Sequence, residues 1–177
     1  MQRISKIRRL VRFFSVAAVL ALGVGPAAAN GVLTGPAGSV AFGTLVTNLP
    51  NGQIVVTDPS FNNNVTGAKY GAVYLYATNL TLLSAITGGN TNDQVGSGGI
   101  TLLANGNYLI HSPKWSTNCG AVTWVNATNG ILADGAVGGV VTATNSLVGS
   151  KSGNGGNFPS GGDMIGWYNG IRYVTAL

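Results

Sequence analysis

The stretch LPNGQIVVTDPSF, at residues 49–61, decides the fold because the chain contains it twice. Its second copy, LANGNYLIHSPKW, covers residues 103–115 and begins 54 residues later. Each copy is an apolar run between an Asn-Gly pair and a proline, which is the pattern of a β-strand between turns. Self-similarity at a fixed spacing indicates a repeat architecture, in which each unit buries its apolar faces against its neighbours.

Two further blocks recur in the same order. GAVY at residues 71–74 returns as GAVT at 120–123. NDQVGS at 92–97 returns as NSLVGS at 145–150. Three blocks in one order are a strong repeat signal, and they place a first β repeat at residues 30–98 and a second at residues 99–150.

Residues 151–177 form a Gly- and Asn-rich junction followed by a partial third repeat. That third copy begins at DMIG, residues 163–166, and ends after NGIRYV, residues 169–174.

Each full repeat predicts four strands, because short runs rich in Val, Ile, Leu, Thr and Tyr alternate with Gly, Asn and Pro. The expected strands are 40–48, 53–57, 71–77 and 80–86 in the first repeat, and 99–103, 107–112, 121–125 and 137–143 in the second. No segment after the first 29 residues shows a sustained helical period. We therefore expect an all-β domain.

The turn residues recur with the strands. An Asn-Gly pair between two strands predicts a type I′ hairpin turn, because it suits two positive φ angles. A proline ends the second strand of each copy, since it cannot donate to a ladder. The hallmark positions of the repeat are Asn51, Gly52, Pro59 and Gly71 in the first copy and Asn105, Gly106, Pro113 and Gly120 in the second.

Four antiparallel strands in about 50 residues are typical of a β-propeller blade. The chain then holds two blades and part of a third, fewer than a closed propeller needs. We expect a fragment of a larger protein or a partial propeller that oligomerises, and a β-solenoid is the structural competitor. An isolated chain of this kind exposes an unpaired apolar blade face and is expected to self-associate.

Residues 1–29 predict a secretory signal peptide with a helical apolar core. Five basic residues precede an apolar run at residues 13–24, and Ala27 and Ala29 form an A-x-A cleavage site before Asn30. A membrane anchor would need about 20 continuous apolar residues. We therefore expect export to the cell surface or the exterior, with the periplasm as an alternative, and no membrane span after cleavage.

The net charge of +5 belongs to that segment. From Asn30 onward four basic and four acidic side chains remain, so the net charge is 4 − 4 = 0. A neutral chain has no electrostatic footprint for a phosphate backbone, which excludes a nucleic-acid partner of the usual kind. The single cysteine, Cys119, excludes an intramolecular disulfide, and we expect a small buried thiol.

The chain is poor in catalytic side chains. His111 is the only histidine, and the four acids (Asp58, Asp93, Asp134 and Asp163) are isolated in the sequence. Acid/base pairs and calcium loops need several such groups together. We expect no catalytic residue, no metal site and no cofactor, with Asp58 and Asp93 capping turns.

Three aromatic residues, Tyr108, Trp115 and Trp124, are candidate contacts for surface glycans. Each also has a packing interpretation. Trp124 alternates onto a sheet face and suits an inter-blade core. Trp115 follows a Ser-Pro corner and suits a buried plug.

The motifs resemble two known repeats. Phe42-Gly43 with NGQIVV at 51–56 and GAVYLY at 71–76 resembles the FG-GAP repeats of integrin-type β-propellers, although the tight turn at residues 49–52 replaces their calcium loop. The second copy is similar to a repeat of unknown function in large bacterial surface proteins, including filamentous-haemagglutinin-like ones. The segments that carry this second likeness are NGNYLIHSPKW at 105–115, GAVTW at 120–124 and NSLVG at 145–149.

The resemblance implies an exported, non-enzymatic repeat protein that is adhesin-like or structural, with further copies of the repeat or surface glycans as partners. A lectin-like carbohydrate-binding propeller is the alternative, and a secreted hydrolase is the third interpretation.

Overall fold

The computed structural model describes residues 31–149 and two further strands, β10 (Ile165–Tyr168) and β11 (Ile171–Val174). Strands and turns make up nearly all of this part of the chain, which confirms the all-β prediction. Within it, no helix is long and apolar enough to cross a membrane. The predicted signal peptide and its cleavage positions, Ala27, Ala29 and Asn30, lie outside the described residues.

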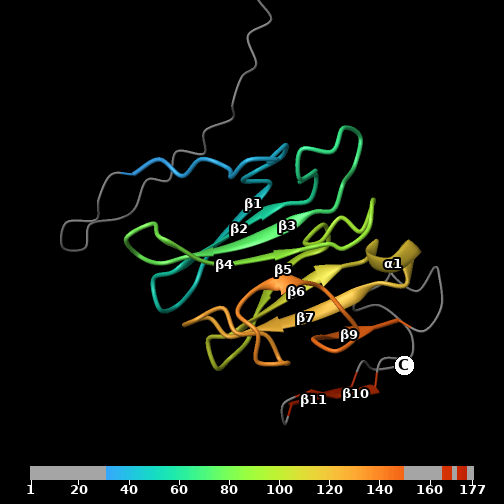
Figure 1. Ribbon diagram of the computed structural model, residues 1–177. Coiled ribbons are helices and arrows are strands. Elements are labelled where there is room, and N and C mark those ends of the chain that lie inside the picture. The colour runs from blue at the N-terminus through green and yellow to red at the C-terminus, as the bar shows by residue number, and fades with distance from the viewer. Residues whose placement is uncertain (1–30, 150–164, 169–170, 175–177) are drawn as a thin grey trace, which may run out of the picture.

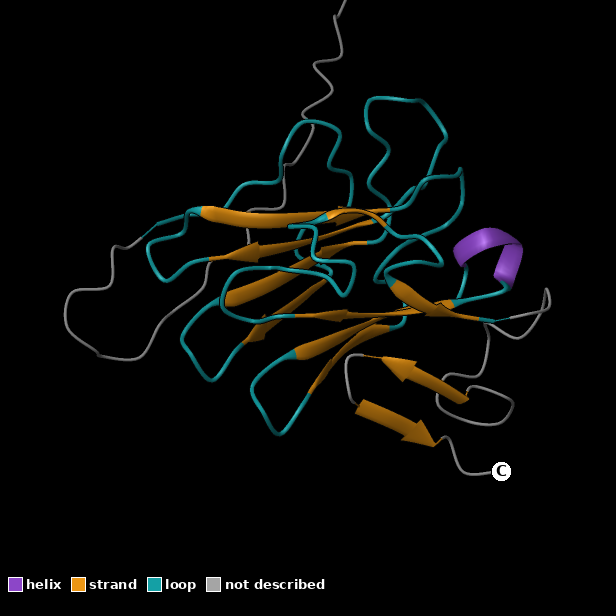
Figure 2. Ribbon diagram, turned by 60° about the horizontal axis from the view of Figure 1, so that its bottom comes forward, coloured by secondary structure: helices purple, strands orange, loops and turns teal. Residues whose placement is uncertain are grey.

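Two sheets stack as layers (Figures 1 and 2). The first has the order β1-β2-β3-β4-β8, with β8 parallel to β4 and the other neighbours antiparallel. The second is antiparallel, with the order β5-β6-β7-β9. Their strands are β1 (Leu45–Asn48), β2 (Ile54–Asp58), β3 (Ala72–Tyr76), β4 (Leu82–Thr87), β5 (Gly99–Leu102), β6 (Tyr108–Ser112), β7 (Ala121–Val125), β8 (Gly139–Val140) and β9 (Ser146–Val148).

The fourth strand of the second repeat is not where the sequence places it. Residues 137–143 contain β8, which pairs with β4 in the first sheet, while β9 completes the second sheet. Gly138 and Gly139 have φ angles of 63° and 107°, a backbone that turns the chain away from its own sheet. The amide of Val141 then donates to the Thr87 carbonyl at 2.9 Å. The segment between β7 and β9 thereby links the two sheets.

The third recurring block is also not equivalent in space. Residues 145–148 are mostly strand β9, whereas residues 92–95 belong to a loop whose Val95 makes only an isolated bridge to Gly71. The equivalent hydrogen bonds are those of Gly88, whose amide donates to the Gly71 carbonyl, and of Gly149, whose amide donates to the Gly120 carbonyl. Each of these bonds lies just after the last strand of its repeat, so β9 in the second repeat is the counterpart of β4 in the first.

The Asn-Gly turns differ from the predicted type I′ geometry. Only the glycines, Gly52 (φ 83°) and Gly106 (φ 84°), have positive φ. The Gly52 amide donates to the Leu49 carbonyl at 2.9 Å, and the Asn51 side chain accepts from the amide of Gln53 at 3.1 Å. The loop has one residue more than a type I′ turn allows, so it forms a type I turn closed by a glycine bulge.

The prolines and the glycines that precede β3 and β7 behave alike in both repeats. Strands β2 and β6 end immediately before Pro59 and Pro113. Gly71 and Gly120 have φ angles of 73° and 82°. A Cβ at Gly71 would collide with the backbone nitrogen of Val95, so only glycine fits there.

Each sheet has two distinct faces, because side chains alternate along a strand. We call the face that carries the first residue of β2 or β6 the front face and the opposite one the back face. In the first sheet, the front face comprises Ile54, Val56, Ala72, Tyr74 and Tyr76, and the back face Val55, Val73, Leu75 and Ile86. In the second, the front face comprises Tyr108, Ile110, Ala121 and Val125, and the back face Thr101, Leu109, His111, Val122, Trp124 and Leu147.

The back face of the first sheet packs on the front face of the second. Val55 and Leu75 from the former and Tyr108 from the latter belong to one buried cluster, completed by loop residues such as Leu132. Each aliphatic side chain enclosed in this way contributes about 1.5–3 kcal/mol. A back face therefore meets a front face, so both repeats present their front faces in the same direction. In a two-fold sandwich, two equivalent faces would meet instead.

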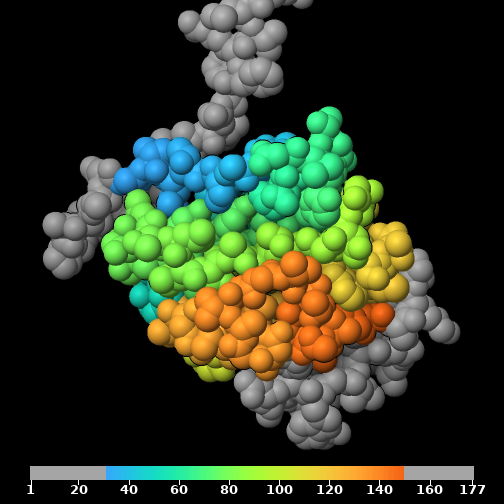
Figure 3. Space-filling model, viewed as in Figure 1, coloured from blue at the N-terminus to red at the C-terminus, as the bar shows by residue number. Residues whose placement is uncertain are grey.

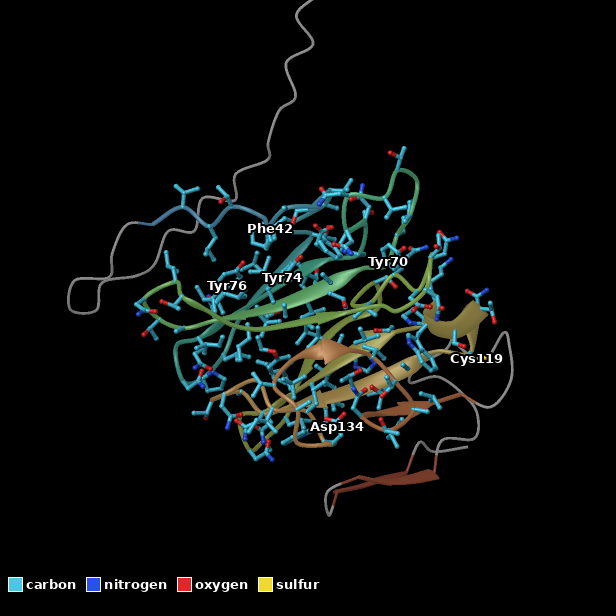
Figure 4. All side chains as sticks on the ribbon, in the orientation of Figure 1. Phe42, Tyr70, Tyr74, Tyr76, Cys119 and Asp134 are labelled. Carbon is cyan, nitrogen blue, oxygen red and sulfur yellow. The ribbon has the colours of Figure 1, made fainter. Side chains whose placement is uncertain are left out.

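The N-terminal segment covers the front face of the first sheet (Figures 3 and 4). Leu33 and Phe42 pack against its buried cluster. The Phe42 ring lies 5.7 Å from that of Tyr74 and 6.3 Å from that of Tyr76, measured between centroids. Residues 31–44 thus act as a cap on one end of the stack.

Candidate functional site

Asp58 is a buried structural acceptor. Its carboxylate accepts hydrogen bonds from the amides of Val40 (3.0 Å), Ala41 (2.9 Å) and Ser60 (3.2 Å). Backbone N–H groups thus satisfy a charge that has no exposed surface. Asp58 caps the Pro59 turn, as the sequence predicts, and it also fastens the N-terminal cap to the first sheet.

Asp93 has a similar role between the two repeats. Its Oδ2 accepts from the amides of Gly89 (3.0 Å) and Asn90 (2.8 Å), and its Oδ1 accepts from Ser116 at 3.0 Å. Ser116 lies in the short element α1 (Trp115–Asn118), which follows β6. Asp93 therefore holds the loop of one repeat against the corner of the next.

The element α1 is not a right-handed helix. Ser116, Thr117 and Asn118 have φ angles of 47°, 56° and 66°. These values describe a left-handed turn, and the amide of Gly120 closes it on the Trp115 carbonyl at 3.0 Å. Cys119, the expected buried thiol, is a free cysteine that is only half-buried beside this turn (Figure 4).

The other two acids are Asp134 and Asp163. Asp134 is exposed and accepts from the amide of Ala136 at 3.0 Å. Asp163 lies outside the described residues. Among residues 31–149 no three side chains of the His, Cys, Asp or Glu type gather where they could hold a metal ion. The two buried carboxylates accept hydrogen bonds from the amides of different loops.

His111 lies on the back face of the second sheet. Its Nε2 is 2.9 Å from the Thr101 hydroxyl on the neighbouring strand. Its Nδ1 is shielded from solvent and has no hydrogen-bond partner in the described part of the chain. Burial lowers the pKa of the imidazole below its usual value of 6.5. A neutral ring is therefore favoured at this position.

Trp124 lies on the same back face, directly across from Leu109 on β6. It is half-buried, and its indole Nε1 is shielded from solvent without a partner among the described residues. Buried indole N–H groups usually donate a hydrogen bond. Of the three aromatic candidates, Trp124 is thus the one on an outward face of the stack.

The other two candidates are engaged in packing. Tyr108 has no exposed surface and lies between the two sheets. Trp115 packs against the same cluster, and its Nε1 donates to the Val141 carbonyl at 3.2 Å. These positions agree with the plug interpretation of Trp115. They leave neither ring free to form a platform for a sugar.

The back face of the second sheet was not predicted as a unit. Its apolar members are Leu109, Val122, Trp124 and Leu147. Leu109 and Val122 are only 4% and 8% exposed, yet they belong to neither buried cluster of the two sheets. The alternation in β6 and β7 carries this signal, but strand pairing is needed to bring these side chains together.

Part of the chain is similar to a known family of repeats. Residues 102–156 match a family described as a repeat of unknown function (DUF5650). The matched segment contains β6 to β9, so this part of the chain is a repeat unit, as the recurring motifs predict. No curated protein and no solved structure matches the chain.

Proposed function

We propose that the chain is an exported, non-enzymatic β-repeat module that serves a structural or adhesin-like role at a bacterial cell surface. The observation that carries this proposal is the stacking of two equivalent sheets by unlike faces. Contacts of that kind repeat without a built-in end, which suits an extended array or a propeller. The resemblance to repeats of bacterial surface proteins and to FG-GAP propeller blades supports the same role.

The use of the polar side chains supports a non-enzymatic role. Asp58 and Asp93 are occupied by backbone amides, and His111 contacts a threonine hydroxyl. In this role the residues hold loops and strands in register. A hydrolase assay on wild type and His111→Ala tests it, and activity abolished by the substitution would refute the non-enzymatic part of the proposal.

The apolar leader at residues 13–24 supports export. Expression of the full chain in a bacterium, followed by N-terminal sequencing, is expected to give a mature protein that begins at Asn30. Protease added to intact cells is expected to digest that product at the surface. An uncleaved chain that stays in the cytoplasm would refute the export part of the proposal.

Carbohydrate binding is the second candidate, and Trp124 is the observation that favours it. An indole on the outward face of the second sheet can stack against a sugar ring. Glycan-array binding lost in Trp124→Ala but kept in Trp115→Phe would favour this lectin-like role over a purely structural one.

A further inference from the structure

The back face of the second sheet has the same design as an interface that the molecule already contains. Leu109 is equivalent to Val55, Val122 to Val73 and Trp124 to Leu75 in the two copies of the repeat. The first-sheet members of these pairs are at most 1% exposed, because the front face of the second sheet covers them. The back face of the second sheet therefore resembles that of the first, so the front face of another sheet is a suitable neighbour for it.

Two unpartnered polar atoms on this back face point to an occupant. Trp124 Nε1 and His111 Nδ1 are both shielded from solvent and lack partners within residues 31–149. A purely apolar cover would leave both groups unsatisfied, which destabilises a buried interface. An occupant with backbone or side-chain acceptors at its surface would satisfy the indole.

The opposite end of the stack is closed to copies of the same sheet. There the front face of the first sheet lies under Leu33 and Phe42, and Asp58 fixes the covering segment by its bonds to Val40 and Ala41. A second molecule therefore has no free front face on its first sheet to offer. The remaining source of a front face is a further repeat that follows the second one in the same chain.

The hairpin of β10 and β11 is suited to begin that repeat. Its strands pair antiparallel, with Tyr168 opposite Ile171. NGIRYV at residues 169–174 corresponds to NGNYLI at 105–110, which contains the start of β6. The hairpin also lies on the side of the second sheet away from the first (Figures 1 and 2).

We propose that the back face of the second sheet is the docking surface for a third sheet of the same repeat, of which β10 and β11 are the first two strands. The stack then has two different ends. Residues 31–44 cap one end, and further sheets are added only at the back face of the other. This inference depends on the repeat geometry and not on export or a surface role. The docking proposal and the proposed function can therefore fail independently of each other.

Limited trypsin digestion of the full chain tests the docking, because Arg172 lies within β11. Docking protects this site, so Leu147→Glu and Trp124→Glu are expected to speed its cleavage by about tenfold or more, since cleavage follows local opening. The matched control is Val137→Glu, at an exposed apolar position outside the back face. It is expected to leave the cleavage rate unchanged. Circular dichroism checks that each variant keeps its sheets.

Three results would overturn the proposal. In the first, Arg172 is cut in the wild type as fast as in a free peptide of residues 160–177. In the second, it is protected equally in the wild type and in both back-face variants. In the third, the wild type is a dimer that Leu147→Glu dissociates with no change at Arg172, which would assign the face to a second copy.

If the variants fail to fold, nuclear Overhauser contacts in the unmodified chain decide the matter. Contacts from the Trp124 indole proton to residues 165–174 are expected, and their absence would refute docking.

Discussion

Val55 and Leu109 occupy equivalent positions in the two repeats, yet they lie in different environments. Val55 is enclosed between the two sheets, whereas Leu109 lies on the far side of the second sheet, outside both buried clusters. A two-fold sandwich would place equivalent residues in equivalent environments. The difference shows that the two repeats pack through unlike faces, with the N-terminal segment covering the front face of the first sheet.

The carboxylate of Asp58 is expected to be a main attachment of the N-terminal cap. Asp58→Asn replaces one acceptor oxygen by an NH₂ group that opposes backbone N–H donors. We expect a loss of about 2–4 kcal/mol in the free energy of unfolding, measured by urea denaturation. Asp134→Asn, at an exposed turn, is the control and should change stability by less than about 0.5 kcal/mol. Equal effects at the two positions would contradict this role.

Gly71 is expected to tolerate no side chain. Gly71→Ala places a Cβ against the Val95 backbone in addition to the cost of a positive φ. The expected loss of stability is about 3 kcal/mol or more. Gly67 has a φ of 79° but open space around it, so Gly67→Ala should cost only about 1 kcal/mol. Thermal unfolding of both variants measures the difference, and a tolerated Gly71→Ala would show that the loop at Val95 lies elsewhere.

The hydroxyl of Tyr108 is buried between the sheets without a partner among the described residues. Tyr108→Phe keeps the ring and removes an unsatisfied polar group, so stability should stay the same or increase. Tyr108→Ala leaves a cavity in the core and should cost about 3–5 kcal/mol. Chemical denaturation of the two variants gives both values. A clear loss in Tyr108→Phe would reveal a hydrogen bond of that hydroxyl.

His111 should make stability depend on pH near neutrality. Burial lowers its pKa in the folded chain below the value of 6.5 for an exposed imidazole. The unfolded chain then binds more protons between the two pKa values, so stability is complete above about pH 6.5 and decreases as the pH falls through this window. His111→Gln should flatten the profile of unfolding free energy between pH 5.5 and 7.5, values chosen on either side of the usual histidine pKa of about 6.5. An unchanged slope in this variant would assign the dependence to other groups.

The sequence alone predicts the local elements well. Strands β2 and β6 lie between an Asn-Gly pair and a proline, and β3 and β7 are apolar runs that follow Gly71 and Gly120. These signals act within a few residues. The capping role of Asp58 is local in the same way. The turn type differs since Pro50 adds a loop residue that the Asn-Gly signal does not register.

Long-range pairing could not be predicted in the same manner. The segment at residues 137–143 reads as a strand, but which sheet receives it depends on the free edge of β4 and on the backbone at Gly138 and Gly139. The assembly of the back face from β6, β7 and β9 likewise follows from register. Apolar runs do not encode register, because one-residue shifts exchange the two faces of a strand.

The stacking of unlike faces can be measured directly by nuclear Overhauser spectroscopy on the methyl-labelled chain. Contacts are expected between the methyl groups of the first sheet's back face, Val55 and Leu75, and the Tyr108 ring on the second sheet's front face, with none between Val55 and Leu109. Strong contacts between Val55 and Leu109, with none to Tyr108, would show a two-fold sandwich and contradict the packing of unlike faces.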